Sequence, residues 1–203
     1  MENLKPTTQR LRPGSVLGGI VCALSLLARV AGGTELHTGN PHEVMAGYLR
    51  ALPAYVHWPT NSLTTPEQPW RIGILGADPF GDMLETNLRD RQAAGRGFAI
   101  SRALKLKDLP PCEILFIAIK DEDALKKIFD ELGSRPVLTV GEHDDFLTLG
   151  GIVQLQTRDT VKIFINLDRA RAAQLEIPKR MLDVASEVIE NGVRRKLKDR
   201  PCP

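Results

Sequence analysis

The sequence predicts an α/β protein: a single three-layer α/β/α domain with a mostly parallel mixed sheet and a C-terminal hairpin plus helices. Three observations support this prediction. Apolar runs alternate with helical stretches, as in proteins whose parallel sheet is covered by helices on both faces. The run CEILFIAI, residues 112–119, is continuously apolar, which is typical of a strand buried on both faces. The segment GIVQLQTRDTVKIFINL divides at Arg158-Asp159 into two strands of a hairpin, which makes the sheet mixed.

In the first half of the chain, a helix is expected from a stripe of apolar residues at helical spacing. The stripe consists of Val44, Met45, Tyr48, Leu49, Leu52, Tyr55 and Val56. Pro53 lies inside it and can kink the helix. After a polar loop, residues 71–75 are expected to form a strand. Asp78 is then expected to be the N-cap of a second helix, with Pro79 at the first helical position.

The second half continues the alternation. Strands are expected at GRGFAIS and RPVLTV, and DEDALKKIFDELG is a helix with an acidic start that ends at Gly133. EHDDFLTLGG is a short turn or helix. DRARAAQLEIPKRMLDVASEVIE is expected to finish the domain as one or two helices, the second starting near Pro178. Met181, Leu182, Ala185, Val188 and Ile189 are expected to form its apolar face.

The first 33 residues have the pattern of a cleaved signal peptide. A positive n-region precedes an apolar run, Val16 to Ala28, which is too short to span a membrane comfortably. Small residues follow, and cleavage is expected after Gly32; an uncleaved anchor is the alternative. The predicted parts of the chain are a signal peptide at residues 1–33, an α/β domain at 41–192 and a basic, solvated tail at 193–203.

The charge balance excludes a broad nucleic-acid-binding face. The whole chain carries 27 basic and 25 acidic residues, a formal net charge of +2. Removal of the first 32 residues takes away four basic residues and one acidic residue, and leaves a net charge of −1. Binding to nucleic acid relies on Lys and Arg side chains that neutralise phosphates, so no nucleic-acid partner is expected.

A glycine-punctuated turn is a candidate ligand site of low specificity. Gly76 and Gly81 have the G-x-x-x-x-G spacing of a phosphate-binding loop, but Asp82 and Met83 stand where such a loop needs Lys and a hydroxyl residue. A nucleoside triphosphate is therefore not expected there. The start of the following helix can still bind an anion. The candidate residues for such a ligand are Gly76, Asp78 and Gly81.

Other candidate chemistry is sparse. His143 with Asp144 or Asp145 could ligate a metal, but adjacent residues rarely converge on one ion, and a capped turn explains them better. His57 is expected at the end of a packed helix. The sequence has no G-x-S-x-G motif for a serine nucleophile. We therefore expect no enzyme activity, no cofactor and no metal.

Export would place the mature chain in an oxidising compartment. Cys112 and Cys202 are its only cysteines once the signal peptide is removed. They are candidates for one internal disulfide, although sequence separation says nothing about whether they meet. Packing of Cys112 in the buried strand is the other interpretation.

Several segments, taken in order, resemble one protein family. They are YVHWP, RIGILGADPFGDML, GRGFAIS, CEILFIA, PVLTVGEHDDFLTLGGIVQL and VKIFINLDRARAAQLEIPKRMLDVASEVI. Over roughly Glu43 to Ile189 they resemble the YfiR family of exported bacterial proteins. The resemblance implies a compact α/β domain, often dimeric and without catalytic activity. Pro53 and the position of Cys202 beyond the matched region depart from the family pattern.

The resemblance also implies a function. Members of the YfiR family are periplasmic repressors that bind the extracytoplasmic sensor domain of a membrane diguanylate cyclase and hold cyclic di-guanylate synthesis down; an outer-membrane lipoprotein relieves this repression. Other members serve other membrane receptors, including histidine kinases. The leading hypothesis is thus a periplasmic regulatory binding protein. The alternatives are an accessory to a sensor kinase, or a periplasmic domain that binds a small molecule or anion through the 76–81 turn or the 142–151 segment.

Overall fold

A computed structural model of the protein describes residues 40–60, 65, 67–157 and 161–197. The description below concerns the unit Thr38–Pro203. The predicted signal peptide and Cys202 lie outside the described residues. No helix in the described ranges is long and apolar enough to cross a membrane.

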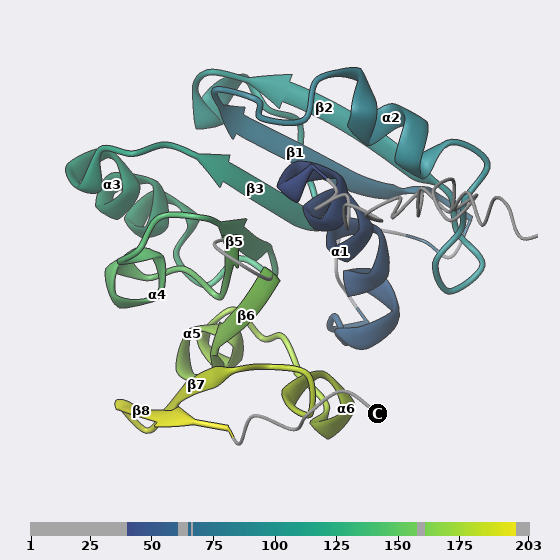
Figure 1. The fold of residues 1–203 in the computed structure, drawn as a ribbon. Helices are drawn as coiled ribbons and strands as arrows, with labels where there is room; N and C mark the ends of the chain where they lie inside the picture. The colour runs from purple at the N-terminus through teal and green to yellow at the C-terminus, as the bar shows by residue number, and fades with distance from the viewer. Residues whose placement is uncertain (1–39, 61–64, 66, 158–160, 198–203) are drawn as a thin grey trace, which may run out of the picture. The chain divides into compact units, whose positions relative to one another are not determined.

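The centre of the unit is one eight-stranded sheet with the order β2-β1-β3-β4-β5-β6-β7-β8 (Figure 1). Strands β2, β1, β3, β4 and β5 are parallel to one another, whereas β5–β6 and β7–β8 are antiparallel pairs. The strands are β1 (Trp70–Gly76), β2 (Phe98–Ala103), β3 (Ile114–Ala118), β4 (Leu138–Gly141), β5 (Val153–Thr157), β6 (Val161–Asn166), β7 (Glu187–Glu190) and β8 (Val193–Lys196). The predicted class, an α/β domain with a mixed sheet, is confirmed.

Helices supply the outer layers. They are α1 (Pro41–Tyr55), α2 (Asp82–Leu88), α3 (Glu122–Leu132), α4 (Phe146–Leu149), α5 (Leu167–Ala172) and α6 (Lys179–Leu182), with a short 3-10 helix η1 (Leu106–Asp108). Helix α3 shows why the sequence folds locally as it does. The Asp121 side chain accepts a hydrogen bond from the Ala124 N–H at 2.7 Å, acidic residues occupy the first turn, and Gly133 ends the helix with φ of 54°. Its predicted start and end are confirmed.

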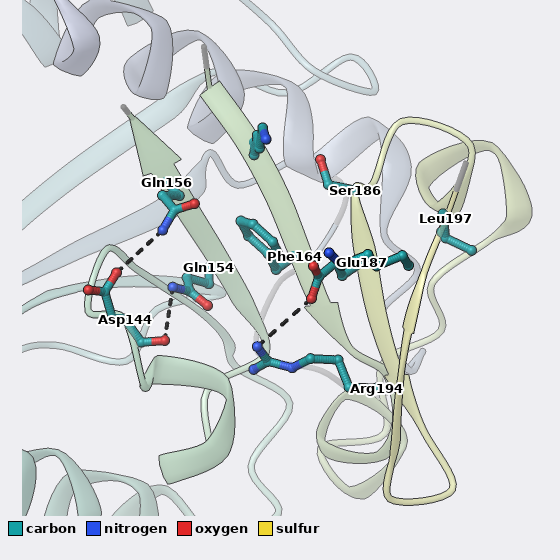
Figure 2. A pocket seen from close by; sticks show the side chains of 10 residues that line it. Asp144, Gln154, Gln156, Phe164, Ser186, Glu187, Arg194 and Leu197 are labelled. Atoms are coloured by element: carbon teal, nitrogen blue, oxygen red, sulfur yellow. Dashed lines mark hydrogen bonds and ion pairs between the residues drawn. The ribbon is translucent and has the colours of Figure 1, made fainter. Parts of the chain in front are cut away.

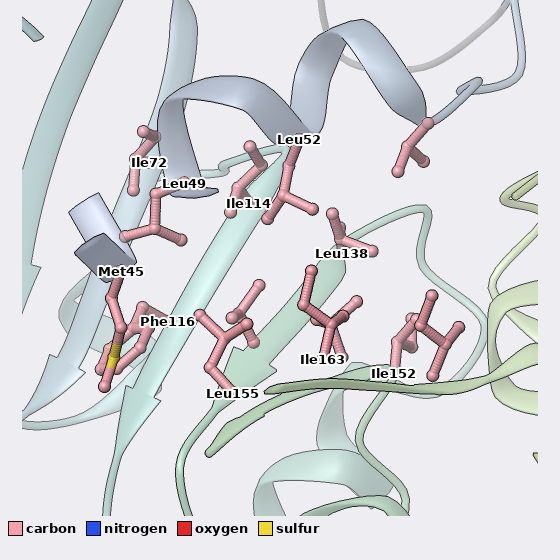
Figure 3. Packing of buried hydrophobic residues seen from close by; sticks show 14 of the residues in the cluster. Met45, Leu49, Leu52, Ile72, Ile114, Phe116, Leu138, Ile152, Leu155 and Ile163 are labelled. Carbon is pink, nitrogen blue, oxygen red and sulfur yellow. The ribbon is translucent and has the colours of Figure 1, made fainter. Parts of the chain in front are cut away.

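Two apolar clusters lie on opposite faces of the sheet. Along β3, Ile114 and Phe116 join the cluster that includes α1, α2, α5 and α6, whereas Leu115 and Ile117 join the cluster of α3 and α4. This alternation follows from the period of two in a strand, and it makes both faces of β3 apolar. Figure 3 shows Met45, Leu49 and Leu52 of α1 packed over the first face. Pro53 lies inside α1, and the helix continues to Tyr55.

The C-terminal part differs from the prediction in two places. Residues 187–190 form the strand β7 rather than the end of a helix, and residues 193–196 form the edge strand β8 rather than a tail. The turn between them explains both errors. Asn191 and Gly192 have φ of 53° and 71°, the backbone that a two-residue hairpin turn needs. The carboxylate of Asp168 accepts hydrogen bonds from both N–H groups of this turn, at 2.9 and 2.8 Å.

Candidate functional site

The glycine turn lies where β1 ends, at the carboxyl edge of the parallel strands. A Cβ on Gly76, whose φ is 98°, would come within 2.6 Å of the Ala118 carbonyl oxygen, so only glycine fits there. Gly81 has φ of 52° and is the N-cap of α2. The predicted N-cap role of Asp78 is wrong, because α2 begins at Asp82. The Asp78 carboxylate instead accepts from the Phe80 N–H at 2.8 Å, within the turn.

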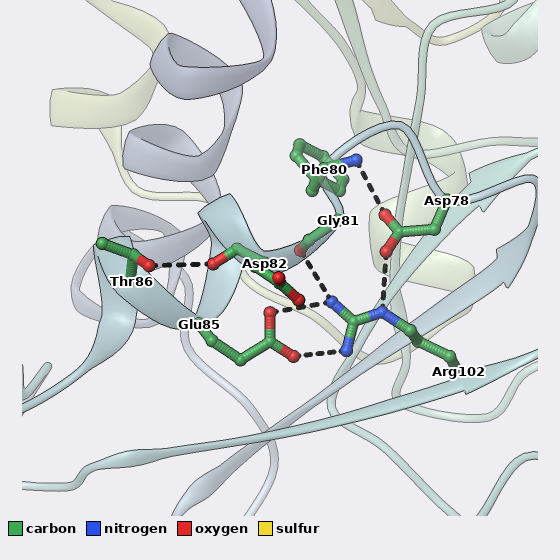
Figure 4. Close-up of polar contacts among 7 residues, drawn as sticks. All are labelled: Asp78, Phe80, Gly81, Asp82, Glu85, Thr86 and Arg102. Carbon is green, nitrogen blue, oxygen red and sulfur yellow. Dashed lines mark hydrogen bonds and ion pairs between the residues drawn. The ribbon is translucent and has the colours of Figure 1, made fainter.

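Arg102 of β2 ties this turn to α2 (Figure 4). Its Nε donates to Asp78 Oδ2 at 2.7 Å, one terminal nitrogen donates to Glu85 Oε2 at 2.9 Å, and the same nitrogen reaches the Gly81 carbonyl at 3.1 Å. The hydrogen bond from Arg102 lowers the pKa of Glu85, and the two carboxylates together raise the pKa of Arg102. The positive charge of Arg102 is therefore already neutralised by the carboxylates of Asp78 and Glu85.

A cleft of about 790 Å³ lies at the same edge of the sheet. Ala77 and Pro79 of the glycine turn line it together with residues 142–145, but the three predicted ligand residues, Gly76, Asp78 and Gly81, do not. His42 Nε2 lies 3.8 Å from Glu142 Oε2, and the His42 ring meets Phe80 edge to face at 6.0 Å. Burial raises the pKa of Glu142. Lys120 is another basic group in the cleft wall.

Acidic side chains dominate this cleft. They are Glu122, Glu142, Asp144 and Asp145. In the segment before α4, the Asp145 N–H donates to His143 Nδ1 at 3.1 Å. This contact agrees with the interpretation of residues 142–145 as a turn. No group of three or more His, Cys, Asp or Glu in the described ranges is placed to hold a metal ion. Negative charge at the rim opposes the binding of an anion, which weakens the anion-binding alternative.

A second candidate surface is the open half of one sheet face. Helices α3 and α4 cover this face over β1, β3 and β4, and α4 also packs on parts of β5 and β6; beside α4, side chains of β5 to β8 line a hollow of about 540 Å³ (Figure 2). The strand register places Gln154, Phe164, Glu187 and Lys196 in one row across the four strands. Phe164 is half-buried against the cluster of α3 and α4. An apolar ring thus lies at the centre of a polar surface.

Some polar and charged side chains of the open face form hydrogen bonds or ion pairs with one another. The Gln154 Nε2 and Gln156 Nε2 atoms donate to the carbonyl and the carboxylate of Asp144, at 3.2 and 3.4 Å. Arg194 lies 3.8 Å from Glu187. Lys162 and Lys196 are exposed and form no ion pair within the described ranges. The free charge of this face is therefore positive, which fits an acidic partner.

The remaining candidates have structural explanations. His57 follows α1 as expected; its backbone pairs with that of Glu176, and its Nδ1 lies 3.7 Å from the Glu176 carboxylate. Cys112 is a buried free thiol, and burial raises its pKa to about 11. The predicted bridge to Cys202 stays a prediction, because Cys202 lies outside the described residues.

One buried ion pair was not foreseen from the sequence. Glu113 directly precedes the apolar strand β3 and, although charged, is only 1% exposed. It accepts from the Arg71 N–H at 2.9 Å and from the Arg71 guanidinium at 2.8 Å. Only the presence of a carboxylate in an otherwise apolar strand pointed to it. The pair joins the start of β1 to the residue before β3, and neither side chain lines the cleft or the hollow.

The structure is thus a three-layer α/β domain with an acidic cleft at the carboxyl edge of its sheet and an open, basic sheet face. The family model described as DUF4154, YfiR/HmsC-like, matches residues 42–186, so the chain belongs to the YfiR/HmsC-like family. This family is regulatory rather than catalytic and is associated with the control of membrane signalling proteins. The resemblance predicted from the sequence motifs is confirmed. A comparison with curated proteins found no match for the chain.

Proposed function

We propose that the protein is a periplasmic repressor that binds the sensor domain of a membrane-bound diguanylate cyclase and lowers its activity. Family membership across residues 42–186 is the observation that carries this proposal. The N-terminal pattern of a positive n-region, an apolar run and small residues supports export. An outer-membrane lipoprotein that relieves the repression belongs to the same proposal.

The open sheet face is the proposed contact surface for the sensor domain. On this face, Lys162 and Lys196 form no ion pair within the described ranges; Lys162 lies two residues before Phe164 on β6, and Lys196 lies in the row of Phe164 on the far side of Glu187. The surface thus combines an apolar centre with free positive charge. Aromatic anchors surrounded by polar groups dominate many protein interfaces, and complementary charge raises the association rate. An acidic surface with an apolar side chain at its centre is the matching partner.

Repression follows from linkage between binding and conformation. A repressor shifts the cyclase toward its inactive state only by binding that state more tightly. A tenfold shift in the ratio of the two states requires about 1.4 kcal/mol of differential binding free energy. Such a difference is small compared with the free energy available from one apolar anchor and two ion pairs.

Binding to the purified periplasmic domain of a cyclase encoded beside this chain tests the proposal. We expect saturable binding in calorimetry, with a loss of affinity of at least tenfold for Phe164→Ala and about threefold for Lys162→Glu. Lys127→Glu on α3 is the matched control, because Lys127 is an exposed lysine away from the open face. Unchanged affinity in all three variants would contradict the proposed surface. Absence of binding by the wild-type chain would contradict a cyclase partner, and the same assay with a sensor kinase domain tests the alternative receptor.

A further inference from the structure

A third concave region lies at the amino end of β3 and β4, at the opposite end of these strands from the acidic cleft. Its volume is about 310 Å³, and ligand pockets commonly measure about 300–1,000 Å³. The cleft and the hollow of the open face are lined mainly by polar side chains, whereas this region, the amino-end pocket, has an apolar wall. The aliphatic side chains of the wall come from η1 and the loop after it, from β3, and from the end of α3 and the loop that follows: Leu106, Leu109, Leu115, Leu132 and Val137.

The walls of the amino-end pocket are stiff. Pro110, Pro111 and Pro136 line it, and proline has a fixed φ and no N–H, so these positions offer no backbone donor. Leu106 and Leu109 are half-buried, which leaves part of the apolar wall in contact with solvent. An apolar ligand that displaces this water gains free energy, and a stiff wall loses little conformational entropy on binding.

Cys112 lies at the base of the pocket and is 7% exposed. Gly73 of β1 makes room for it, because a Cβ on Gly73 would lie 3.0 Å from Cys112 Sγ and 3.1 Å from Leu115 Cδ1. Since Gly73 has no side chain, Cys112 and Leu115 can pack against the backbone of β1, which leaves the pocket outside them unfilled. A bound ligand would therefore cover the Cys112 thiol.

Arg135 is the charged residue of the pocket, and its side chain is exposed. Its Nε and one terminal nitrogen donate to the carbonyls of Leu132 and Glu131, at 3.3 and 2.8 Å, which holds the guanidinium at the carboxyl end of α3. No carboxylate in the described ranges forms an ion pair with Arg135. Because the guanidinium retains further N–H donors, it can bind an anionic group at the rim of the pocket.

We propose that the amino-end pocket binds an aliphatic carboxylate, such as a medium-chain fatty acid, with its alkyl chain against the leucines and its carboxylate on Arg135. No aromatic ring lines the pocket among the described residues, which favours an alkyl chain over a planar ring that stacks. Charge-assisted hydrogen bonds from the guanidinium orient the carboxylate. The pocket shares no lining residue with the open face, so this site is separate from the proposed contact surface.

Calorimetry with hexanoate, octanoate and decanoate tests the proposal on the protein purified after expression of the full chain. We expect saturable binding that tightens about fourfold for each additional methylene group that the pocket buries. The neutral analogue 1-octanol is expected to bind at least about tenfold more weakly than octanoate, because it lacks the charged acceptor. No saturable binding of any of the three carboxylates, or equal affinity for octanoate and 1-octanol, would overturn the proposal.

Two substitutions separate the charge from the apolar wall. Arg135→Gln is expected to weaken octanoate binding at least about tenfold and to leave 1-octanol binding unchanged, since the carbonyl end of α3 then repels the carboxylate. Leu106→Trp fills the pocket and is expected to abolish binding of both ligands. Leu104→Trp is the matched control, because Leu104 is 79% exposed and does not line the pocket. Circular dichroism establishes that the variants are folded. Unchanged octanoate affinity in Arg135→Gln or in Leu106→Trp would overturn the assignment.

Alkylation of Cys112 locates the ligand without any substitution. Octanoate in the amino-end pocket covers the thiol, so the rate of its reaction with iodoacetamide is expected to fall over the same concentration range as the calorimetric binding. Peptide mass mapping distinguishes Cys112 from the other cysteines. Saturable octanoate binding with an unchanged rate at Cys112 would place the ligand elsewhere and overturn the proposal.

Discussion

The two halves of one sheet face contrast sharply. Over β1, β3 and β4, helices α3 and α4 bury an apolar cluster around Phe146, which is fully buried. Over β5 to β8, the same face is only partly covered, by α4 on β5 and β6, and its side chains are polar apart from Phe164 and Ile189. Both halves belong to one continuous sheet. The covered half stabilises the fold, and the open half is the surface that we propose contacts a partner.

The largest expected effect compares one phenylalanine from each half. Phe146 packs edge to face on Phe129 at 5.3 Å, and its ring fills the space that Gly141 and Gly151 leave free. Phe146→Ala is expected to lower the free energy of unfolding by about 3–5 kcal/mol. Phe164→Ala is expected to lower it by less than about 2 kcal/mol, because the ring is only half-buried. Urea unfolding of both variants measures the contrast, and equal losses would contradict it.

The next largest effect concerns the ion pair at the amino end of the covered half. Arg71→Met removes the guanidinium from Glu113, which leaves a carboxylate with 1% exposure and one remaining backbone donor. The expected loss is about 2 kcal/mol, less than for a fully buried pair, because Arg71 is partly exposed. Replacing both residues, Arg71→Met with Glu113→Leu, is expected to recover part of the loss. A double variant less stable than Arg71→Met would contradict this account.

Glu142 lies between the two halves, directly after β4. Its substitution is expected to change the free energy of unfolding only slightly. Burial raises its pKa, so its folded-state pKa exceeds the unfolded value. Its contribution to stability is thus fully present below the unfolded pKa and is lost as pH rises through the folded pKa. Glu142→Gln is expected to stabilise the protein at pH 7 by less than about 1 kcal/mol, because a third of the side chain is exposed. Thermal unfolding should show that the stability gained by Glu142→Gln vanishes near pH 4. A gain that grows as the pH falls would contradict the raised pKa of Glu142.

A disulfide between Cys112 and Cys202 would link the two halves. The order of the strands in the sheet means that the chain after Leu197 would have to span a long distance to form it. Between β3 and β8 lie five strand spacings, about 24 Å, and Cys112 lies at the opposite end of the strands from Leu197. Five residues extend at most about 18 Å. The geometry favours free thiols, so a reducing agent is expected to leave the melting temperature unchanged. A fall in the melting temperature, with no thiol titrated after denaturation, would establish the bridge.

Much of the covered half was predictable from the sequence, because its patterns are local. The continuous run of β3 and the capped helix α3 each carry their own signature. Outside that half, β5 and β6 pair in the antiparallel direction, as predicted for the hairpin. Val188 and Ile189 were misassigned because their spacing also fits a helical stripe. The Asn191-Gly192 turn, with its positive φ angles, was the local feature that distinguishes the two structures.

The candidate site was less predictable, because it depends on contacts between distant residues. Asp78 has the side chain of an N-cap, and only Arg102 on β2 shows that its carboxylate is used otherwise. The glycine turn and the 142–145 segment meet because parallel strands end at the same edge of a sheet. The open face arises from which strands the helices leave uncovered, and no local pattern of residues 153–197 encodes that.

Cellular cyclic di-guanylate is the most direct measure of the proposed function. It should be compared in the wild type, in a strain lacking the gene, and in that strain supplied with the full chain or with a chain lacking residues 1–33. The proposed repression predicts a rise on deletion, a return to the wild-type level with the full chain, and no return with the shortened chain, since the sensor domain lies across the membrane. An unchanged level on deletion would contradict the repression of a cyclase, and rescue by the shortened chain would contradict a periplasmic site of action.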